Sequence, residues 1–310
     1  MTAPIPIVID TDPGIDDALA ILAAMADPGL TLLGLTTVFG NVPVETATRN
    51  ALQLTALAGQ ETPVAEGAAR PLLRAPAPHP DFVHGREGFG EAVLPPPERA
   101  PDPRNAASFL AETARDARAR GTPLTIVAVG PLTNLATALT EHPEMAQTVG
   151  RVVVMGGTLR HPGNVTPTAE ANFWQDPHAA AQVLAASWPV TIVGLDVTEC
   201  VRLYPEDLDA LPQGRVHRFL REAIGYYARF HLESHGFLGC YLHDPAAVCA
   251  TADPSLLETW RTQATVIVEG PEEGRLQASS SGQPVDVALA ADAPGIRARL
   301  RTALKTYGDT

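Results

Sequence analysis

Short apolar runs alternate along the chain with segments whose apolar residues recur every three or four positions. The runs predict buried strands and the longer repeats predict helices. Their alternation is typical of a parallel sheet covered by helices on both faces. We expect strands at Ile5–Asp10, Leu30–Val38, Leu124–Val129, Arg151–Met155, Val190–Leu195, Gln263–Val268 and Val285–Leu289.

Helices are predicted between these strands, and they follow the same order along the chain. We expect them at Pro13–Ala26, Val44–Leu57, Leu132–Thr140, Pro177–Ala186, Val216–Glu233, after His243-Asp244-Pro245, and at Pro294–Tyr307. The predicted fold class is α/β, with an open, doubly wound, Rossmann-like β-sheet that is mainly parallel, or mixed, and has helices on both faces.

Residues 70–104 form a long segment rich in proline and alanine, which resembles a linker between two domains. However, it also holds His79, Phe82, His84 and the run Gly88-Phe89-Gly90. Long loops with aromatic residues and glycines are more often lids or binding loops than linkers. We therefore predict one domain, residues 1–310, with a long active-site loop at about 70–104.

The net charge of −13 argues against nucleic acid or an anionic membrane as a partner. Neither a signal peptide nor a membrane-spanning stretch is expected, so the chain is predicted to be soluble and cytoplasmic. Cys200, Cys240 and Cys249 are odd in number and lack the spacing of a zinc site. They are predicted to be buried, reduced thiols.

Four carboxylates are crowded where the first strand meets the first helix, at Asp10, Asp12, Asp16 and Asp17, and no Lys or Arg lies among them. Such a cluster predicts a bound cation, and oxygen ligands favour a hard ion such as calcium or magnesium. A helix cap is the alternative, with Asp12 as N-cap and the later pair offsetting the helix dipole. Capping does not explain Asp10, which would be a buried charge.

Polar residues also follow the other predicted strands. They are Gly40-Asn41, Gly130-Pro131-Leu132-Thr133-Asn134, Gly156-Gly157, the run Gly163–Asn172 and the pair His243-Asp244. Taken singly, each could be an ordinary turn or cap. Because parallel strands bind ligands beyond their carboxyl ends, we expect these loops to meet at one site. Carboxylates together with amides suit a sugar diol, whose hydroxyls need both donors and acceptors.

These motifs resemble those of the calcium-dependent nucleoside hydrolases of the inosine-uridine preferring type. The segment Asp10-Thr11-Asp12-Pro13-Gly14-Ile15-Asp16-Asp17 reproduces the amino-terminal signature of that family. Further matches, in family order, are Gly40-Asn41, Gly130–Asn134, Val154–Gly157, Gly163-Asn164, Glu170–Asn172, Gly194–Asp196 and His243–Pro245. The resemblance implies hydrolysis of the N-glycosidic bond of ribonucleosides to ribose and free base.

The resemblance also implies roles for individual residues. Asp12, Asp17, the backbone carbonyl of Val129 and Asp244 would bind one Ca²⁺, and Asp12 would take a proton from the calcium-bound water. Asp10 would orient its neighbours by hydrogen bonds. The residues that would hold the ribose are Asp16, Asn41, Asn164, Glu170, Asn172 and the backbone of Met155.

On the nucleobase side, the resemblance implies His243 as the general acid, because histidine can be protonated near neutral pH. His84 is a second candidate. Tyr227 and His231 are candidate nucleobase contacts, and His231 stands where purine-tolerant members carry a tyrosine, so base preference stays open. The resemblance further implies a homodimer or homotetramer.

Two other functions compete with this interpretation. A haloacid-dehalogenase-like phosphatase also begins with a strand ending in two aspartates, but such enzymes use a lysine, and the only lysine here is Lys305 near the carboxyl end. A non-catalytic nucleoside or ribose binder would keep the same diol contacts. The presence of Asp12, Asp17, His243 and Asp244 together favours an enzyme.

Overall fold

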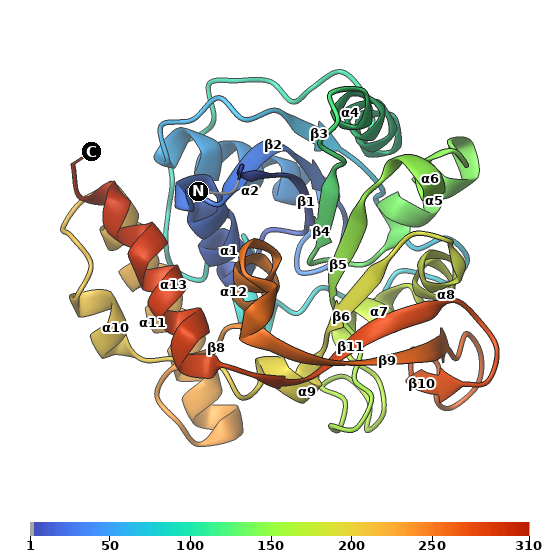
Figure 1. Cartoon of the computed structure of the whole chain (residues 1–310). Helices are drawn as coiled ribbons and strands as arrows, with labels where there is room; N and C mark the ends of the chain where they lie inside the picture. Colours follow the sequence, from blue (N-terminus) through green and yellow to red (C-terminus); the bar gives the residue numbers. More distant parts are fainter. Residues whose placement is uncertain (1–2, 310) are drawn as a thin grey trace.

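The computed structural model describes residues 3–309, and its centre is a nine-stranded sheet with the order β10-β9-β11-β6-β5-β4-β1-β2-β3 (Figure 1). The strands span β1 Ile5–Thr11, β2 Leu30–Thr37, β3 Val64–Glu66, β4 Thr125–Ala128, β5 Arg151–Met155, β6 Val190–Val193, β9 Leu257–Val266, β10 Leu276–Ser279 and β11 Pro284–Ala291. A separate two-stranded sheet pairs β7 Arg202–Leu203 with β8 Cys240–Tyr241.

The strands from β11 to β3 in this order are all parallel, whereas β9 pairs antiparallel with both β11 and β10. The chain enters at β1, moves outward to β2 and β3, and then returns to β4 on the other side of β1. The strand order therefore reverses between β1 and β4, where Asp10 pairs with Ala128. Ligands of open α/β sheets bind beyond the strand ends at this kind of reversal.

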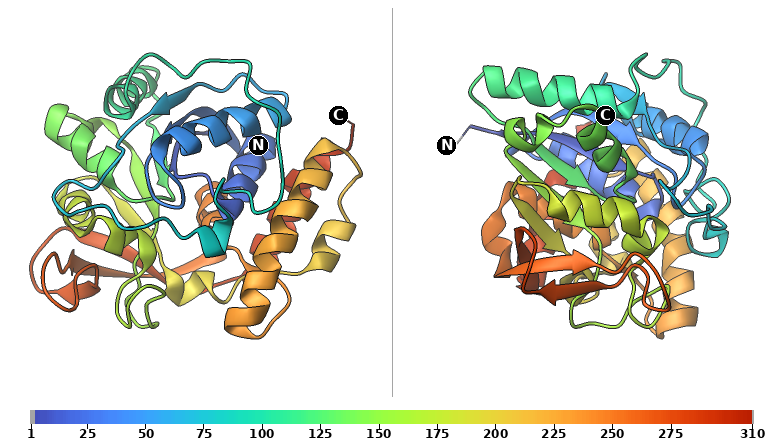
Figure 2. Two further views of the ribbon diagram at one scale, coloured as in Figure 1. Left: turned by 180° about the vertical axis from the view of Figure 1, so that it is seen from behind. Right: turned by 90° about the vertical axis from the view of Figure 1, so that its right-hand side faces the viewer.

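Helices cover both faces of the sheet, as the two further views show (Figure 2). One apolar core packs under α1 Ile15–Ala26, α2 Val44–Leu57, α11 Arg215–His235, α12 His243–Ala252 and α13 Ala293–Leu304. The other packs under α4 Ala106–Ala119, α5 Thr133–Glu141, α6 Met145–Thr148 and α8 Pro177–Ala185. The shorter helices are α3 Asp81–His84, α7 Ala171–Gln175, α9 Leu195–Thr198, α10 Pro205–Asp209, η1 Pro254–Leu256 and η2 Lys305–Asp309.

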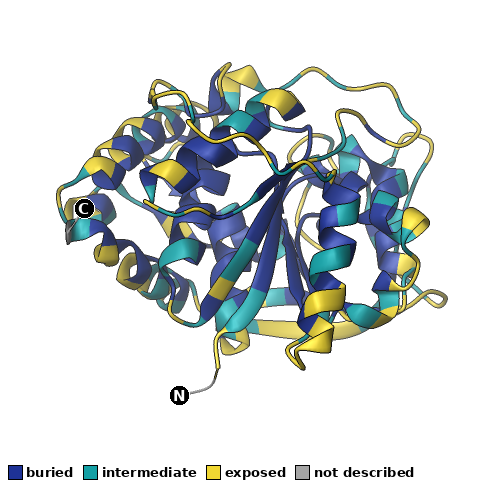
Figure 3. Cartoon of the chain, turned by 90° about the horizontal axis from the view of Figure 1, so that it is seen from above, coloured by how far each residue is buried: buried dark blue, intermediate teal, exposed yellow. Residues whose placement is uncertain are grey.

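Alternating side chains of the central strands feed these two cores. Ile7 and Ile9 of β1 belong to the first core and Val8 to the second, and all three are fully buried. Successive residues of a strand point to opposite faces, so a strand with helices on both sides must be apolar at every position. Figure 3 shows the buried strands between helices whose outer surfaces are exposed. The same rule explains why these strands read as unbroken apolar runs in the sequence.

The predicted fold class is confirmed, and most predicted elements lie within a few residues of the observed ones. Two expectations were wrong, and one long helix was not predicted. Leu195 begins α9 instead of ending a strand, the helix α4 was missed, and Cys200 is exposed although Cys240 and Cys249 are buried. Among the described residues, no helix has the length and apolarity needed to cross a bilayer.

Candidate active site

The aspartates of the amino-terminal motif gather at the carboxyl end of β1, where the chain turns into α1. Asp10, Asp12 and Asp17 are almost completely buried, and Asp16 is 7% exposed. Gly14 is the N-cap of α1, so the capping role considered for Asp12 is wrong. Asp17 does satisfy the helix start, because it accepts hydrogen bonds from the backbone N–H of Gly14 (3.0 Å) and Asp12 (3.3 Å).

Asp12 lies in a slot between two glycines. Its Oδ2 accepts a hydrogen bond of 2.7 Å from the Asn41 backbone N–H. A Cβ atom on Gly40 would lie 1.9 Å from Oδ2, and one on Gly130 would lie 2.6 Å from Oδ1. Only glycine leaves room for the carboxylate at these two positions, which accounts for both glycines that follow β2 and β4.

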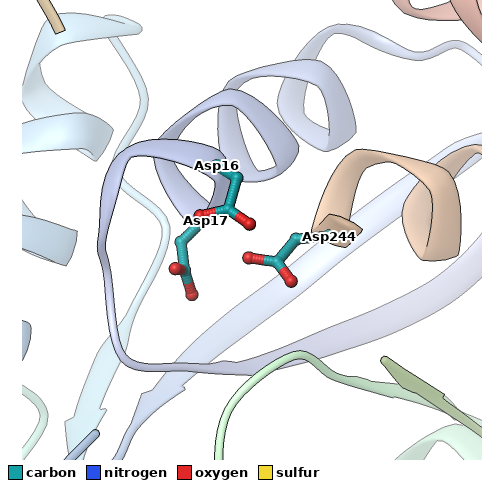
Figure 4. A group of neighbouring side chains, drawn as sticks. All are labelled: Asp16, Asp17 and Asp244. Atoms are coloured by element: carbon teal, nitrogen blue, oxygen red, sulfur yellow. The ribbon is translucent and has the colours of Figure 1, made fainter. Parts of the chain in front are cut away.

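Asp244 joins the cluster from the first turn of α12, far away in the sequence. Oxygens of Asp16, Asp17 and Asp244 lie within 4.8 Å of one another, and Figure 4 shows the three side chains gathered between the first turns of α1 and α12. No basic side chain forms an ion pair with Asp12, Asp17 or Asp244 within residues 3–309, and His84 stands 3.9 Å from Asp16. The strand reversal and α12 thus bring four carboxylates together, and no lysine or arginine of residues 3–309 pairs with them. They are Asp12, Asp16, Asp17 and Asp244.

Burial and mutual repulsion shift the pKa values of this cluster upward. Burial and then the charge of Asp17 raise the pKa of Asp12 well above its usual value. Burial, followed by Asp16, Asp17 and Asp12, does the same to the pKa of Asp244. Asp10 lies in β1, just before the turn that carries the other aspartates. Burial raises its pKa to about 7, although Asn134 and Thr36 donate hydrogen bonds to it.

A divalent cation fits this donor set. Asp12 Oδ1 and Asp16 Oδ1 are buried oxygens that have no hydrogen-bond partner. Buried oxygens of this kind need a cation or a donor. All the candidate ligands are oxygens, which suits a hard ion and disfavours zinc or copper.

Asp16 and Asp244 of the cluster line one wall of a cavity of about 590 Å³. Its acidic lining includes Asp16, Glu170, Glu199 and Asp244, and none of its described lining residues is a lysine or arginine. Residues 77–80 and 82–84 of the long loop cover another side. Of the nine histidines in the chain, six line this cavity: His79, His84, His161, His231, His235 and His243.

The amide residues expected to hold a sugar line the same cavity, together with Glu170 and Met155. Asn172 donates from Nδ2 to the carbonyls of Val129 (2.9 Å) and Met155 (3.1 Å), and within residues 3–309 no group donates to its own side-chain carbonyl. Asn41 donates to Asp17 at 3.1 Å, and Asn164 accepts from the Ala171 N–H at 3.0 Å. These bonds hold the amides rigidly, which prepares them to bind hydroxyls.

Glu170 also has a structural role that was not predicted from the sequence. Its carboxylate is the N-cap of α7 and accepts from the backbone N–H of Asn172 and Phe173, and also of Gly157. Burial raises its pKa in spite of these three hydrogen bonds. Glu170 therefore joins the loop after β5 to α7, and it places Asn172 at the floor of the cavity.

Two histidines beside the aspartates, His84 and His243, are held by different hydrogen-bond partners. The backbone N–H of Ile15 donates to Nδ1 of His84 (3.2 Å), which leaves the proton of the neutral ring on Nε2. Nδ1 of His243 lies 2.8 Å from the hydroxyl oxygen of Thr198. Burial lowers the pKa of both rings to about 3, with neighbouring histidines adding to the shift. This direction runs against the expectation that His243 is protonated near neutral pH, and its role as general acid stays a prediction.

The ring of His231 has the opposite tautomer to that of His84. Its Nδ1 lies 2.9 Å from the Tyr227 carbonyl, which can only accept, so Nδ1 carries the proton and Nε2 is an acceptor. Burial lowers the pKa of this ring to about 4. Tyr227, Phe230 and Tyr241 surround it with ring centroids 4.3 to 5.2 Å away. The far wall of the cavity is thus apolar and aromatic, as a flat heterocycle requires.

Several cavity residues were missed in the sequence. His161 and Glu199 face each other at 3.6 Å, Trp174 comes from α7, and His235 follows His231 by one helical turn. The spacing of His231 and His235 was a usable signal, although the predicted helix ended at Glu233, before His235. No local pattern marked the other three: His161 lies in a loop, while Trp174 and Glu199 belong to or directly follow helices of five and four residues, which are too short for a periodic signal.

Comparison with known proteins identifies the family. Residues 7–298 match the family model described as inosine-uridine preferring nucleoside hydrolase. Uridine nucleosidase 1 of Arabidopsis thaliana is 43% identical over 81% of this chain and 74% of its own length. Non-specific ribonucleoside hydrolase RihC of Salmonella paratyphi A is 38% identical over 96% of both chains.

Solved structures give the same result. A plant nucleoside hydrolase superposes with a TM-score of 0.91 at 35% identity, over 97% of this chain and 99% of the other. The match spans the aspartate cluster, both sides of the strand reversal and α12. This chain belongs to the inosine-uridine preferring nucleoside hydrolase family.

Proposed function

We propose that this chain hydrolyses the N-glycosidic bond of ribonucleosides, including uridine, to ribose and free base, and that calcium is its cofactor. Ribonucleoside hydrolysis follows from the family. The observation that carries the proposal is a cavity with uncompensated buried carboxylates on one wall and aromatic rings on the other. A ribose and a heterocyclic base need these two environments side by side.

Uridine is proposed because the Arabidopsis relative is named a uridine nucleosidase. The Salmonella relative is named non-specific, so purine nucleosides belong in the same assay. The cavity of about 590 Å³ leaves room for either kind of base.

Asp12, Asp17, Asp244 and the Val129 carbonyl are the residues we propose for the cation, with Asp16 beside them. Calcium is preferred to magnesium because it accepts more oxygen ligands in a less regular arrangement. When bound, calcium would neutralise the carboxylates and polarise the oxygens of water and of the ribose diol. Asp16, Asn41, Asn164, Glu170, Asn172 and the Met155 backbone are proposed to hold the ribose.

In the proposed reaction, Asp12 accepts the proton of the water that attacks C1′ of the ribose. The C1′–N bond breaks and its electron pair leaves with the base. Positive charge grows on the ribose as this happens. Asp12 and Asp16 stabilise that charge more in the transition state than in the substrate, and this difference accelerates the reaction.

The departing base is proposed to be stabilised by His243 and His84. Both rings are neutral at pH 7, so each contributes an N–H donor to the base instead of starting as an imidazolium. Tyr227 and His231 are proposed to contact the base on its other side. His231 offers an acceptor nitrogen, which suits the N–H groups of nucleobases.

Ribose release tests this proposal. Inosine, adenosine, guanosine, uridine and cytidine should be incubated with the protein after chelation, and then after addition of CaCl₂ or MgCl₂. We expect release from uridine that is lost on chelation and restored best by calcium. Asp12→Asn should lower the rate by about 10²–10⁴-fold.

Asp27→Asn is the matched control, because Asp27 is a buried carboxylate at the opposite end of α1 that pairs with Arg299. It should keep wild-type activity. Binding of intact uridine without any ribose release would favour the ribose-binding alternative and end the proposal of an enzyme. The cytoplasmic location and the homo-oligomeric state predicted from the sequence stay predictions, and we propose a role in nucleoside salvage along with them.

A further inference from the structure

Thr198 is a buried residue behind the cavity lining, where it contacts His243. It is the last residue of α9, directly after β6, and its side chain is completely buried. Its Oγ1 lies 2.8 Å from Nδ1 of His243, the first residue of α12. The hydroxyl therefore has no access to water, and the imidazole is its partner.

The two segments that carry these residues are joined by backbone hydrogen bonds as well. The Leu242 N–H donates to the Val201 carbonyl at 2.9 Å, and β7 pairs with β8 immediately beyond. Thr198 and His243 therefore cannot drift apart without breaking this small sheet. The contact is a built-in feature of the fold and does not depend on a mobile surface side chain.

The direction of this hydrogen bond follows from the hydroxyl's surroundings. Within residues 3–309, His243 is the only hydrogen-bond partner of Thr198 Oγ1. If the hydroxyl accepted from Nδ1–H, its own O–H would be buried without an acceptor, which costs about 1–3 kcal/mol. If the hydroxyl donates, its proton is satisfied and Nδ1 is the acceptor. The imidazole proton then resides on Nε2, the nitrogen that Thr198 does not occupy.

We propose that Thr198 is a positioning residue for His243, whose hydroxyl orients the ring and keeps the proton on Nε2, facing the nucleobase. This inference rests on the proposed function, in which His243 assists departure of the base. His84 has the same arrangement, with the Ile15 N–H in place of the hydroxyl. Two histidines of the cavity are thus prepared as Nε2–H donors, and only the one at Thr198 can be changed by a side-chain substitution.

A hydroxyl suits this task for a physical reason. A carboxylate at the same place would accept from Nδ1–H and favour a charged imidazolium. A hydroxyl is neutral, so it selects the ring orientation and tautomer without adding charge beside the aspartate cluster.

Thr198→Val tests the proposal because valine keeps the shape of threonine and lacks only the hydroxyl. Thr198→Ser restores the hydroxyl. Thr251→Val is the matched control, since Thr251 is a completely buried threonine of α12 whose hydroxyl bonds to the Ala247 carbonyl, away from the cavity. Calcium-loaded full-length proteins should be assayed with uridine and with p-nitrophenyl β-D-ribofuranoside, whose leaving group is a stable anion that needs no protonation.

With uridine, Thr198→Val should lower kcat by about 10–100-fold with KM nearly unchanged, and Thr198→Ser should recover most of the loss. With the p-nitrophenyl riboside the loss should be less than about threefold. Adding Thr198→Val to His243→Ala should cause no further loss, since the residue acts only through His243. Thr251→Val should match the wild type with both substrates.

Equal losses with both substrates, or a further loss in the double variant, would show a merely structural role and overturn the inference. ¹⁵N NMR of histidine-labelled wild type provides a test even if Thr198→Val does not fold. We expect the His243 proton on Nε2, and a proton on Nδ1 would overturn the inference. Failure of the wild type to release ribose from any nucleoside would instead be a failure of the proposed function, which these measurements distinguish.

Discussion

Substituting Gly40 by alanine is the sharpest test of how the fold positions Asp12. The backbone of Gly40 lies outside the positive-φ region, so alanine brings no backbone strain there. The new Cβ would lie 1.9 Å from Asp12 Oδ2. Restoring an ordinary contact of roughly 3.4 Å requires the carboxylate to retreat by about 1.5 Å.

The structure offers the carboxylate little room to retreat. On its other side, a Cβ at Gly130 would already meet Asp12 Oδ1 at 2.6 Å, so the slot is narrow in both directions. The Asn41 N–H that donates to Oδ2 would lose its partner, and overpacking adds to that cost. We expect a loss of about 1–3 kcal/mol in the free energy of unfolding.

The effect on catalysis should be larger than the effect on stability. A misplacement of about 1 Å can cost about 10²-fold in rate, so Gly40→Ala should lower kcat/KM for uridine by about 100-fold or more. Ribose release under saturating calcium measures this, and calcium titration should show weaker binding. Circular dichroism establishes that the variant is folded at the assay temperature.

Gly225→Ala is the matched control for this variant. Gly225 lies inside α11, and a Cβ there meets no atom within 4 Å. It should keep full activity and gain about 0.5–1 kcal/mol of stability from the better helix propensity of alanine. Folded Gly40→Ala protein with a rate within about threefold of wild type would refute the claim that this slot positions Asp12.

Three further outcomes are expected. First, burial raises the pKa of Asp10 from 3.8 to about 7, so its contribution to stability is fully present below pH 4 and is lost as the pH rises through 7. Urea unfolding in chelator should lose about 2–3 kcal/mol from this group between pH 5 and pH 7.5, and Asp10→Asn should flatten that slope. Second, calcium at one hundred times its Kd should add about 2.7 kcal/mol to the free energy of unfolding, and Asp244→Asn should abolish that gain; an equal gain in the variant would count against Asp244 as a ligand. Third, Asp176→Ala should cost about 2–4 kcal/mol in a melting or urea experiment, because it removes the acceptor of the buried Ala179 N–H, of the partly buried Leu72 N–H and of the buried Thr133 hydroxyl. The exposed cap Asp292→Ala should cost only about 1 kcal/mol, and similar costs for the two would contradict this account.

Much of the sheet could be predicted from the sequence because its strands have helices on both faces. Burial on two sides demands apolar residues at every position, and this leaves an unbroken run such as Ile5–Ile9. The short edge strands β3 and β10 carry no such run, and neither was predicted. The helix α4 was missed because its inward face is mostly alanine, which gives a weak periodic signal.

The aspartate motif could also be interpreted from the sequence as a cation site, since four carboxylates in eight residues cannot be buried without a counter-charge. Gly40 and Gly130 were interpreted from the sequence as turn residues, but the folded structure requires glycine at both positions for a steric reason. Each makes room for Asp12, which is distant in the sequence. Such steric needs leave no local periodicity, and only the folded chain shows them.

By itself the sequence determined the fold class, the acidic motif at the end of the first strand and the family, because local composition and spacing carry that information. Tertiary structure decided which acids meet, since Asp244 reaches Asp16 and Asp17 only through the packing of α12 against α1. It also decided the protonation of the histidines, because burial and hydrogen-bond partners such as Thr198 come from elements far apart in the chain. Charge state and tautomer depend on neighbours in space, and a linear pattern does not contain them.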